Sequence, residues 1–294
     1  MFGCVPPADG QRPTIIFLHL GKTAGWTLSR VLNRNVSPNV RIGNPQNTPH
    51  GFLSVEPIRR FASWPESERA RYRLVSAHMV YGLHAHVPRP SSYLTLLRKP
   101  VARAISGYHR VLETPTHRLH EAVAVRGMSL EDYLTSGVSL ETDNSQTRAI
   151  AGDVDTPFGE TTEELLELAL RNLDERFPVV GLTERFDDLL LVLKRTYGWS
   201  NLLYVRANVT KKKPARDEVP SSTIELIKER NRLDMQLYTA VSERFQALVD
   251  ADPGFDAELE RFRKRNARYQ PWGHLTYTYP RRLREVVSRS RSGS

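Results

Sequence analysis

Short apolar runs rich in β-branched residues recur along the chain, and amphipathic segments separate them. The first run covers residues 14–20 (TIIFLHL) and is bounded by Pro13 and Gly21, which is typical of a strand buried on both faces. Runs of the same kind predict further strands at residues 73–77, 93–97, 178–182 and 202–205.

Helical spacing follows most of these runs. Leu28, Val31 and Leu32 share one face of a predicted helix after the first strand, and Pro100 suits the first turn of a helix at residues 100–112. Three further helices are predicted: one at residues 163–173 after a Thr161-Thr162-Glu163-Glu164 capping box, one at 184–197 ending at Gly198, and a long one through 224–248 capped by Ser221 or Ser222.

Two parts of the chain lack such patterns. Residues 35–70 are rich in Pro, Asn and Arg, which predicts an irregular segment with one short helix at residues 57–62. Residues 281–294 are basic and Ser-rich, and we expect them to fray. Strands alternating with helices predict a single α/β domain with a mostly parallel sheet over residues 14–250, followed by a helical, basic extension over 251–294.

The composition excludes several classes of protein. The chain has 294 residues, of which 39% are hydrophobic, and this apolar content is too high for a disordered chain. The sequence has no glycine period, no long heptad run and no apolar stretch long enough for a membrane span. Cys4 is the single cysteine, which excludes an intramolecular disulfide and a multi-cysteine zinc site.

The N-terminal residues and the net charge bear on location and partners. The first 13 residues have no cationic start and no apolar core, so we expect no signal peptide and a cytoplasmic location. The formal net charge is +9, which is typical either of a protein with an anionic partner or of Arg-rich solvated surfaces. The sequence does not indicate an oligomeric state.

A short loop between the first predicted strand and helix has the character of an anion site. It reads Gly21-Lys22-Thr23-Ala24-Gly25-Trp26-Thr27. Backbone N–H groups in such a turn converge on one point, and the helix dipole adds partial positive charge there. Lys22 adds a full charge, while Thr23 and Thr27 offer hydroxyl donors. The loop therefore predicts an anion cradle of the P-loop type.

This loop departs from the nucleoside triphosphate pattern. A Walker A loop needs a glycine five residues before Gly21, where this chain has Ile16. The apolar run at 93–97 is followed by Arg98 and Lys99 instead of a metal-binding Asp. The sequence thus predicts phosphate-binding groups without a Mg²⁺ site, although transfer of the γ-phosphate of ATP normally uses that metal.

A second strand-to-helix junction, at residues 97–108, also carries cations. Arg98 can form a bidentate pair with a phosphate, and Ser106 in the following helix can donate its hydroxyl. Two anion sites at one edge of a sheet suit a nucleotide that has phosphates at both ends of its ribose. The alternative is that Arg98 and Arg103 simply face solvent.

Together these segments resemble the sulfotransferase superfamily, in particular the heparan sulfate 2-O-sulfotransferase-like branch (sulfotransferase family 2). The first family motif, HxPKTGGTT/S, corresponds to residues 19–27, and the second, R-[DN]-P-x-x-R-x-x-S-x-[YF], to residues 98–108. Two further similarities are Asn144-Ser145-Gln146-Thr147-Arg148 with Gly152, and Val180-Gly181-Leu182-Thr183-Glu184-Arg185-Phe186-Asp187. The chain departs from the family where Gly21 replaces a proline, Trp26 a small residue and Lys99 an acidic or amide residue.

The resemblance implies a fold, a donor and several residue roles. The fold is the P-loop NTPase-like three-layer α/β fold, and the donor is 3′-phosphoadenylyl sulfate (PAPS), used without a metal. Lys22 would serve the bridging oxygen of the phosphosulfate, and Arg98 and Ser106 would hold the 3′-phosphate. The N–H groups from Thr23 to Thr27 would hold the 5′ phosphosulfate; the residues are Thr23, Ala24, Gly25, Trp26 and Thr27.

The resemblance also points to a general base, His78, which follows the predicted strand at residues 73–77 and aligns with a histidine-bearing segment of that branch. The branch often has a second histidine two residues earlier, where this chain has Ser76. His84 and His86 are alternatives in a Pro-bounded loop.

Two further basic positions have open roles. Lys211, Lys212 and Lys213 form either a loop that closes over the nucleotide, as in related enzymes, or a solvated charge run. Arg148 either faces the acceptor or ties a helix end to the core.

The function predicted is transfer of a sulfuryl group from PAPS to a hydroxyl of an acceptor, with a carbohydrate or glycolipid favoured by the branch resembled. One alternative is a P-loop kinase-like phosphotransferase. Another is a non-enzymatic, basic nucleic-acid-binding protein, although the sequence lacks a helix-turn-helix signature, zinc-ligand spacing and an RNP-type aromatic motif. We therefore expect no nucleic-acid partner.

Overall fold

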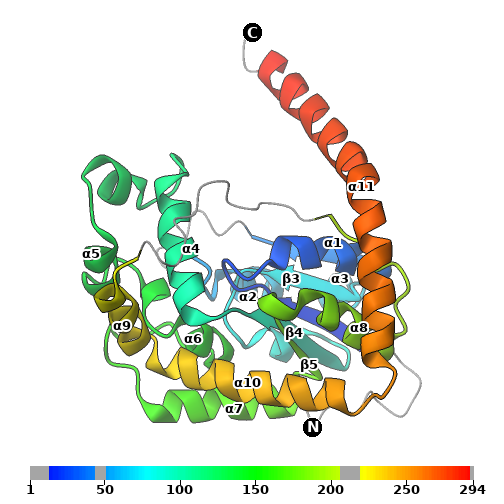
Figure 1. Ribbon diagram of the computed structural model, residues 1–294, viewed down its shortest axis with the longest axis horizontal. Helices are drawn as coiled ribbons and strands as arrows, with labels where there is room; N and C mark the ends of the chain where they lie inside the picture. Colours follow the sequence, from blue (N-terminus) through cyan, green and yellow to red (C-terminus); the bar gives the residue numbers. More distant parts are fainter. Residues whose placement is uncertain (1–12, 44–50, 206–218, 292–294) are drawn as a thin grey trace.

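A five-stranded parallel sheet forms the centre of the protein in a computed structural model, which describes residues 13–43, 51–205 and 219–291 (Figure 1). The strand order is β2-β3-β1-β4-β5, and every neighbouring pair is parallel. The strands are β1 (Thr14–Leu18), β2 (Asn39–Ile42), β3 (Leu74–Ala77), β4 (Ser91–Leu97) and β5 (Val179–Leu182). The predicted α/β fold with helices flanking a parallel sheet is confirmed.

Burial explains which strands the apolar pattern predicts. All five residues of β1 are buried, because β3 and β4 pair with its two edges and helices cover both faces of the sheet. In β2, by contrast, Ile42 is the one buried residue. This strand lies inside the segment that was predicted to be irregular. Its sequence has little apolar content to indicate a strand, and pairing with β3 stabilises it instead.

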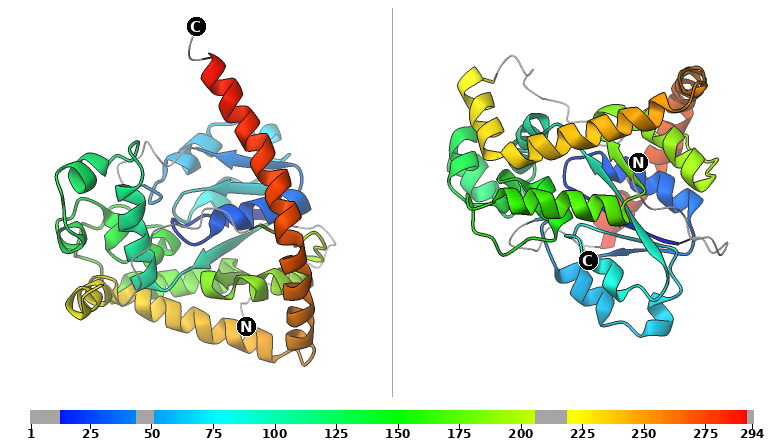
Figure 2. Two further views of the ribbon diagram at one scale, coloured as in Figure 1. Left: turned by 45° about the horizontal axis from the view of Figure 1, so that its top comes forward. Right: turned by 90° about the horizontal axis from the view of Figure 1, so that it is seen from below.

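Eleven α-helices are present in the described residues, and they gather in distinct groups around the sheet (Figure 2). Helices α7 and α10 lie side by side along the lower side of Figure 1, and α4, α5 and α9 pack together at one end. The helices are α1 (Gly25–Asn35), α2 (Glu56–Ala62), α3 (Glu66–Arg69), α4 (Pro100–Leu112), α5 (Leu130–Thr135), α6 (Ser145–Ala151), α7 (Glu163–Arg176), α8 (Phe186–Tyr197), α9 (Ser221–Arg230), α10 (Arg232–Asp250) and α11 (Phe255–Arg291).

One large hydrophobic core joins the sheet to its flanking helices. The start of α11 belongs to this core, because Phe255, Leu259 and Phe262 are buried in it. The predicted extension over 251–294 is therefore anchored to the domain at its beginning.

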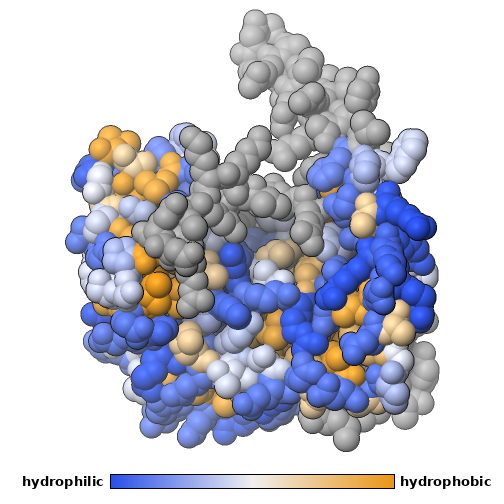
Figure 3. Space-filling view, in the orientation of Figure 1, coloured by the Kyte–Doolittle hydropathy of each residue, from blue (hydrophilic) through white to orange (hydrophobic). Residues whose placement is uncertain are grey.

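On the face shown in Figure 3, hydrophilic residues cover most of the described surface and hydrophobic residues form separate small groups.

The strand predicted at residues 202–205 is wrong. The backbone there binds side chains of α11 instead of a neighbouring strand. The Tyr204 N–H donates to Asn266 Oδ1 at 3.0 Å, and Gln270 Nε2 donates to the Tyr204 carbonyl at 2.6 Å. The segment is apolar because Leu202, Tyr204 and Val205 are buried, and burial alone does not create a strand.

The single long helix predicted through residues 224–248 is two helices, α9 and α10, which meet at Asn231. Asn231 is fully buried and leaves the helical conformation, with φ −119° and ψ 37°. Its Nδ2 donates to the Thr142 carbonyl at 3.2 Å, and this distant bond accompanies the break. The predicted serine cap is also wrong, because Pro220 is the N-cap residue of α9.

One prediction about a helix end also fails, at α7. Helix α7 has Thr162 as its N-cap residue, but no side-chain hydrogen bond caps it, whereas a capping box does form between Ser129 and Asp132 at α5. Helix α11 continues to Arg291, so it includes residues 281–291, for which fraying stays a prediction. In Figure 1 this end of α11 projects away from the rest of the fold.

Candidate active site

The two predicted anion-binding segments lie at the carboxyl edge of the sheet, where parallel strands end together. Strand β1 leads into residues 19–24 and then α1, β3 leads directly to His78, and β4 leads to Arg98. Because β3 and β4 are the two neighbours of β1, these segments are adjacent in space. Crevices outside the carboxyl ends of strands are the usual ligand sites of open α/β sheets.

The loop after β1 has a strained backbone that residues other than glycine rarely adopt. Lys22 and Ala24 have φ values of 67° and 61°. The Thr23 hydroxyl donates to the Leu20 carbonyl at 3.0 Å, and the Thr27 N–H donates to the Ala24 carbonyl at 3.0 Å. Two donors expected to face the anion therefore already have partners that shape the loop.

The departure from proline at Gly21 has a steric explanation. A Cβ on Gly21 would lie 2.7 Å from the ring of Phe52, which is buried and covers the loop. The Phe52 N–H in turn donates to Glu141 Oε1 at 3.2 Å. Burial raises the pKa of Glu141, and the nearby cations Arg103, Arg118 and Lys22 oppose that shift. A buried carboxyl group thus lies in the electrostatic field of the loop lysine.

Arg98 connects the two segments that are predicted to bind anions. Its Nη1 donates to the Lys22 carbonyl at 3.0 Å, and burial lowers the pKa of its guanidinium. Arg103 is almost fully buried and donates from Nη2 to the Glu141 carbonyl at 2.7 Å, so the alternative in which both arginines face solvent is wrong for Arg103. Ser106 is also buried, in α4.

Gln146 holds the backbone of Arg98. Its Oε1 accepts from the Arg98 N–H at 2.9 Å, and its Nε2 donates to the Arg98 carbonyl at 3.0 Å. Asp234 of α10 accepts from the N–H groups of Gln146 and Thr147 at the start of α6, at 3.2 and 2.8 Å. A positioning chain therefore runs from α10 through α6 to Arg98.

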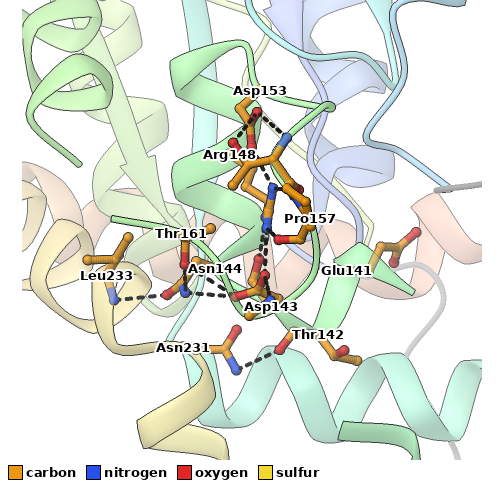
Figure 4. A network of polar contacts seen from close by, with 12 residues as sticks. Glu141, Thr142, Asp143, Asn144, Arg148, Asp153, Pro157, Thr161, Asn231 and Leu233 are labelled. Carbon is orange, nitrogen blue, oxygen red and sulfur yellow. Dashed lines mark hydrogen bonds and ion pairs between the residues drawn. The ribbon is translucent and has the colours of Figure 1, made fainter. Parts of the chain in front are cut away.

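Arg148 is a structural residue. Its guanidinium is fully buried and forms ion pairs with Asp143 at 2.6 Å and Asp153 at 2.5 Å (Figure 4). It also donates to the carbonyls of Thr156 and Pro157. Of the two roles left open by the sequence, Arg148 ties α6 to the core and does not face an acceptor.

His78 stacks on a second histidine that the sequence analysis assigned no role. The register pairs Leu18 with Ala77, the last residues of the adjacent strands β1 and β3. His19 and His78 directly follow these two residues. Their ring centroids are 3.9 Å apart with an interplanar angle of 26°. Gly25 makes room for this pair, because a Cβ there would lie 2.1 Å from the His19 ring.

Both rings are held in their neutral form. Burial and, to a smaller extent, the charge of Arg41 lower the pKa of His78 to about 4. A hydrogen bond to the His19 backbone acts in the opposite direction and raises this pKa. Burial, His78 and Arg41 together lower the pKa of His19 well below its usual value. His78 Nδ1 is buried and has no hydrogen-bond partner among the described residues. A neutral imidazole with an unpartnered nitrogen suits a general base.

Several predicted residues lie elsewhere. His84 Nδ1 interacts with the Tyr93 hydroxyl at 3.1 Å, which places this alternative base in a separate polar contact. Lys211 and Lys212 lie outside the described residues.

Among the side chains that the structure describes, no group of three or more His, Cys, Asp or Glu residues is arranged to hold a metal ion. Within the same part of the chain, no helix combines the length and apolar character of a membrane span.

Comparison with known proteins identifies the family. A sequence model of galactose-3-O-sulfotransferases matches residues 2–272, which is most of the chain. The chain belongs to the galactose-3-O-sulfotransferase family. It is accordingly a sulfotransferase enzyme, as the four motifs predict.

Individual relatives in this group are distant. Human heparan-sulfate 6-O-sulfotransferase 1 is 28% identical, over 85% of this chain and 69% of the human protein. Bovine galactose-3-O-sulfotransferase 3 is 25% identical, over 90% of this chain and 65% of the bovine protein. Mouse heparan-sulfate 6-O-sulfotransferase 3 is 26% identical, over 80% of this chain and 58% of the mouse protein. The chain thus spans about three fifths to seven tenths of these relatives.

The close contact between Gly25 and His19 predicts a steric effect. Gly25→Ala is expected to lower the free energy of unfolding by about 1–3 kcal/mol, because the new methyl group overlaps the buried His19 ring. Denaturant unfolding measures this change.

Two further variants make the test specific. Adding His19→Ala to Gly25→Ala should recover part of the lost stability, since it removes the ring that clashes. Gly107→Ala in α4 is the matched control, because its Cβ would meet nothing within 4 Å, and it should stabilise the helix by about 0.5–1 kcal/mol. Equal stability of Gly25→Ala and the unmodified protein would contradict the contact.

Proposed function

We propose that the sulfotransferase uses PAPS as donor and transfers the sulfuryl group to a hydroxyl of a saccharide acceptor. The observation that carries the proposal is the meeting of three features at one sheet edge: the Lys22 loop, Arg98 bonded to that loop, and the His19–His78 pair. The relatives are named as sulfotransferases of heparan sulfate and of galactose, which supports a saccharide acceptor. A glycolipid that exposes such a sugar falls in the same class.

The loop and Arg98 suit a doubly anionic donor. The donor supplies the activated sulfuryl group. Lys22 would donate to the oxygen that bridges phosphorus and sulfur, where charge develops as the bond breaks. The amides at the start of α1 would hold the 5′ end, and Arg98 with Ser106 the 3′-phosphate. Because Arg98 is bonded to the Lys22 carbonyl, the two ends of the donor would be held by one connected structure.

His78 would act as the general base. The acceptor hydroxyl forms its new bond to sulfur, the sulfur–oxygen bond to the donor breaks, and the hydroxyl proton moves to His78. A neutral imidazole is required at the start of this step, and burial and Arg41 hold it in that form. His19 would act as a positioning residue, because its ring stacks on the His78 ring and restricts its tilt.

Finer assignments stay predictions. The 2-O-like branch rests on the motifs alone, whereas the matched relatives are named as 6-O and galactose-3-O enzymes. Metal-independent transfer follows from the family resemblance. The cytoplasmic location rests on residues 1–12, which lie outside the described residues.

Calorimetric titration tests the donor assignment. The protein is expected to bind PAP, the desulfated donor product, without Mg²⁺, and more tightly than ATP–Mg²⁺. Lys22→Ala should weaken PAP binding by about 10-fold or more, because it removes a charged donor to the phosphate. Lys264→Ala, at an exposed i,i+4 ion pair on α11, is the control and should leave PAP affinity unchanged.

The alternatives have opposite signatures. Tight ATP–Mg²⁺ binding without PAP binding would replace the sulfotransfer proposal with the kinase-like one. Salt-sensitive DNA binding that survives both Lys22→Ala and Arg98→Ala, in a protein that does not bind PAP, would favour the nucleic-acid alternative. Transfer of radiolabelled sulfate to saccharides, lipids and phenols then identifies the acceptor class.

A further inference from the structure

Trp26 is unusual among the apolar side chains of this protein. It is 50% exposed, one of four large exposed apolar residues in the part of the chain that the structure describes. It stands in the first turn of α1 between two buried residues, Gly25 and Thr27. The first family motif, at residues 19–27, has a small residue at this position. The indole of Trp26 is therefore a departure of this chain from that motif, at the edge of the candidate active site.

Arg41 covers part of the indole. Its guanidinium carbon lies 3.9 Å from the centroid of the Trp26 ring. Among the side chains that the structure describes, no carboxylate forms an ion pair with Arg41. Burial lowers the pKa of Arg41, as expected for a cation near protein atoms without a neutralising acid. The stack therefore offers an aromatic surface and an uncompensated positive charge.

The stack borders the proposed base. The Trp26 and His19 ring centroids are 6.3 Å apart with the rings nearly perpendicular, and His19 stacks on His78. Arg41 is level with Ser76 in the sheet, two residues before His78. The strand order β2-β3-β1-β4 places Arg41 and Arg98 on opposite sides of β1. The Trp26–Arg41 stack is thus on the base side of the loop, away from the predicted 3′-phosphate site.

We propose that Trp26 and Arg41 form the acceptor subsite for an anionic sugar ring, one that carries a carboxylate or a sulfate group. The indole would pack against the C–H face of the sugar, and the guanidinium would form a bidentate pair with the anion. Rigid aromatic surface with a fixed charge is well suited to orient a flexible, strongly hydrated ligand. This inference rests on the proposed function, because it takes the neighbouring His78 as the base.

The subsite also explains the charge on this side of the loop. Arg41 opposes protonation of both histidines, and an anionic sugar paired with Arg41 would neutralise that charge once bound. A neutral sugar would leave the Arg41 guanidinium without an anionic partner. The subsite should therefore select anionic rings over neutral rings of the same size.

Calorimetric titration of the PAP-loaded protein tests the subsite with three probes. A heparosan hexasaccharide carries carboxylates and no sulfate, a κ-carrageenan hexasaccharide carries sulfates and no carboxylate, and a hexasaccharide of three N-acetyllactosamine units is neutral. The protein should bind at least one anionic probe at least 10-fold more tightly than the neutral one. The better anionic probe identifies the group that Arg41 pairs with.

Matched variants separate the subsite from general charge. Trp26→Ala and Arg41→Gln should each weaken the anionic probe by about 10-fold or more, and Trp26→Phe should keep most of the affinity because it retains a ring. The controls are Trp272→Ala, at an exposed tryptophan on α11, and Arg71→Gln, at the amino edge of the sheet before β3. Both controls should bind like the unmodified protein.

The outcomes distinguish this inference from the proposed function. Unchanged anionic-probe affinity in Trp26→Ala and Arg41→Gln, with PAP binding intact, would overturn the subsite and leave the donor assignment standing. Equal affinity for neutral and anionic probes would overturn it as well. If the unmodified protein does not bind PAP, the proposed function is refuted instead. The same saccharide titrations, carried out without PAP, would then test the subsite.

Discussion

Replacing His78 with alanine is expected to lower turnover by about 10²–10⁴-fold while PAP affinity stays within about three-fold. The large effect follows because the acceptor proton would lose its destination, and the small one because the donor contacts come from the Lys22 loop and Arg98. Sulfate transfer and PAP titration on the same preparation measure the two quantities. Turnover close to that of the unmodified protein would remove His78 from the mechanism.

The pH profile adds a second readout to this prediction. His78 has a pKa lowered to about 4, so its neutral form dominates above that pH and turnover should fall only as the pH approaches it. An acid limb near 6.5, the ordinary value for histidine, would contradict the lowered pKa of His78. His86→Gln is the control histidine, in the turn at Leu83–His86, and should keep both turnover and profile.

The same shift has a consequence for stability. A histidine whose pKa is lowered in the folded protein binds its proton more readily when unfolded. Between the folded value and about 6.5, the unfolded state therefore holds more protons, and stability rises with pH. His78→Ala should flatten this dependence at acid pH, although His19 keeps a share of it because its pKa is lowered as well.

Arg148→Met is expected to lower the free energy of unfolding by about 3–5 kcal/mol, because it leaves the carboxylates of Asp143 and Asp153 without their cation. Figure 4 shows both carboxylates converging on the buried guanidinium. Denaturant unfolding with a constant slope measures the loss. The network supports the segment that holds Gln146, so activity should fall in proportion to the folded fraction of the protein.

An exposed pair of equal length provides the control. Arg244 and Asp174 are also 2.6 Å apart, but their side chains are 31% and 51% exposed. Arg244→Met should therefore cost at most about 1 kcal/mol, because solvent screens the charges that remain. Equal losses for Arg148→Met and Arg244→Met would mean that burial does not govern the strength of these pairs.

The pattern of apolar residues along the sequence predicted the strands that are buried on both faces of the sheet. Strands β1 and β4 are buried along nearly their whole length because neighbouring strands and helices enclose them. Strand β2 has one buried residue and was not predicted, although it carries Arg41. The apolar segment at 202–205 was predicted as a strand, but its backbone partners are the side chains of Asn266 and Gln270 on α11.

The candidate site divides in the same way. Lys22, Arg98 and His78 could be found from motifs, because each lies at most two residues after an apolar run. His19 was quoted in a motif without a role, and its stacking on His78 required the parallel register of β1 and β3. Gln146 likewise stood in a motif, yet its bonds to the Arg98 backbone join residues 48 positions apart.

By itself, the sequence determined that this protein is an α/β enzyme of sulfotransferase type, and it predicted an anion-binding loop at Lys22 and a second cationic junction at Arg98. These conclusions depend on residues that are neighbours along the chain. Only the tertiary structure decided that Arg148 is structural, that His19 stacks on His78, and that Trp26 meets Arg41. The physical reason is that strand order and register, which no local pattern contains, determine which distant side chains share one site.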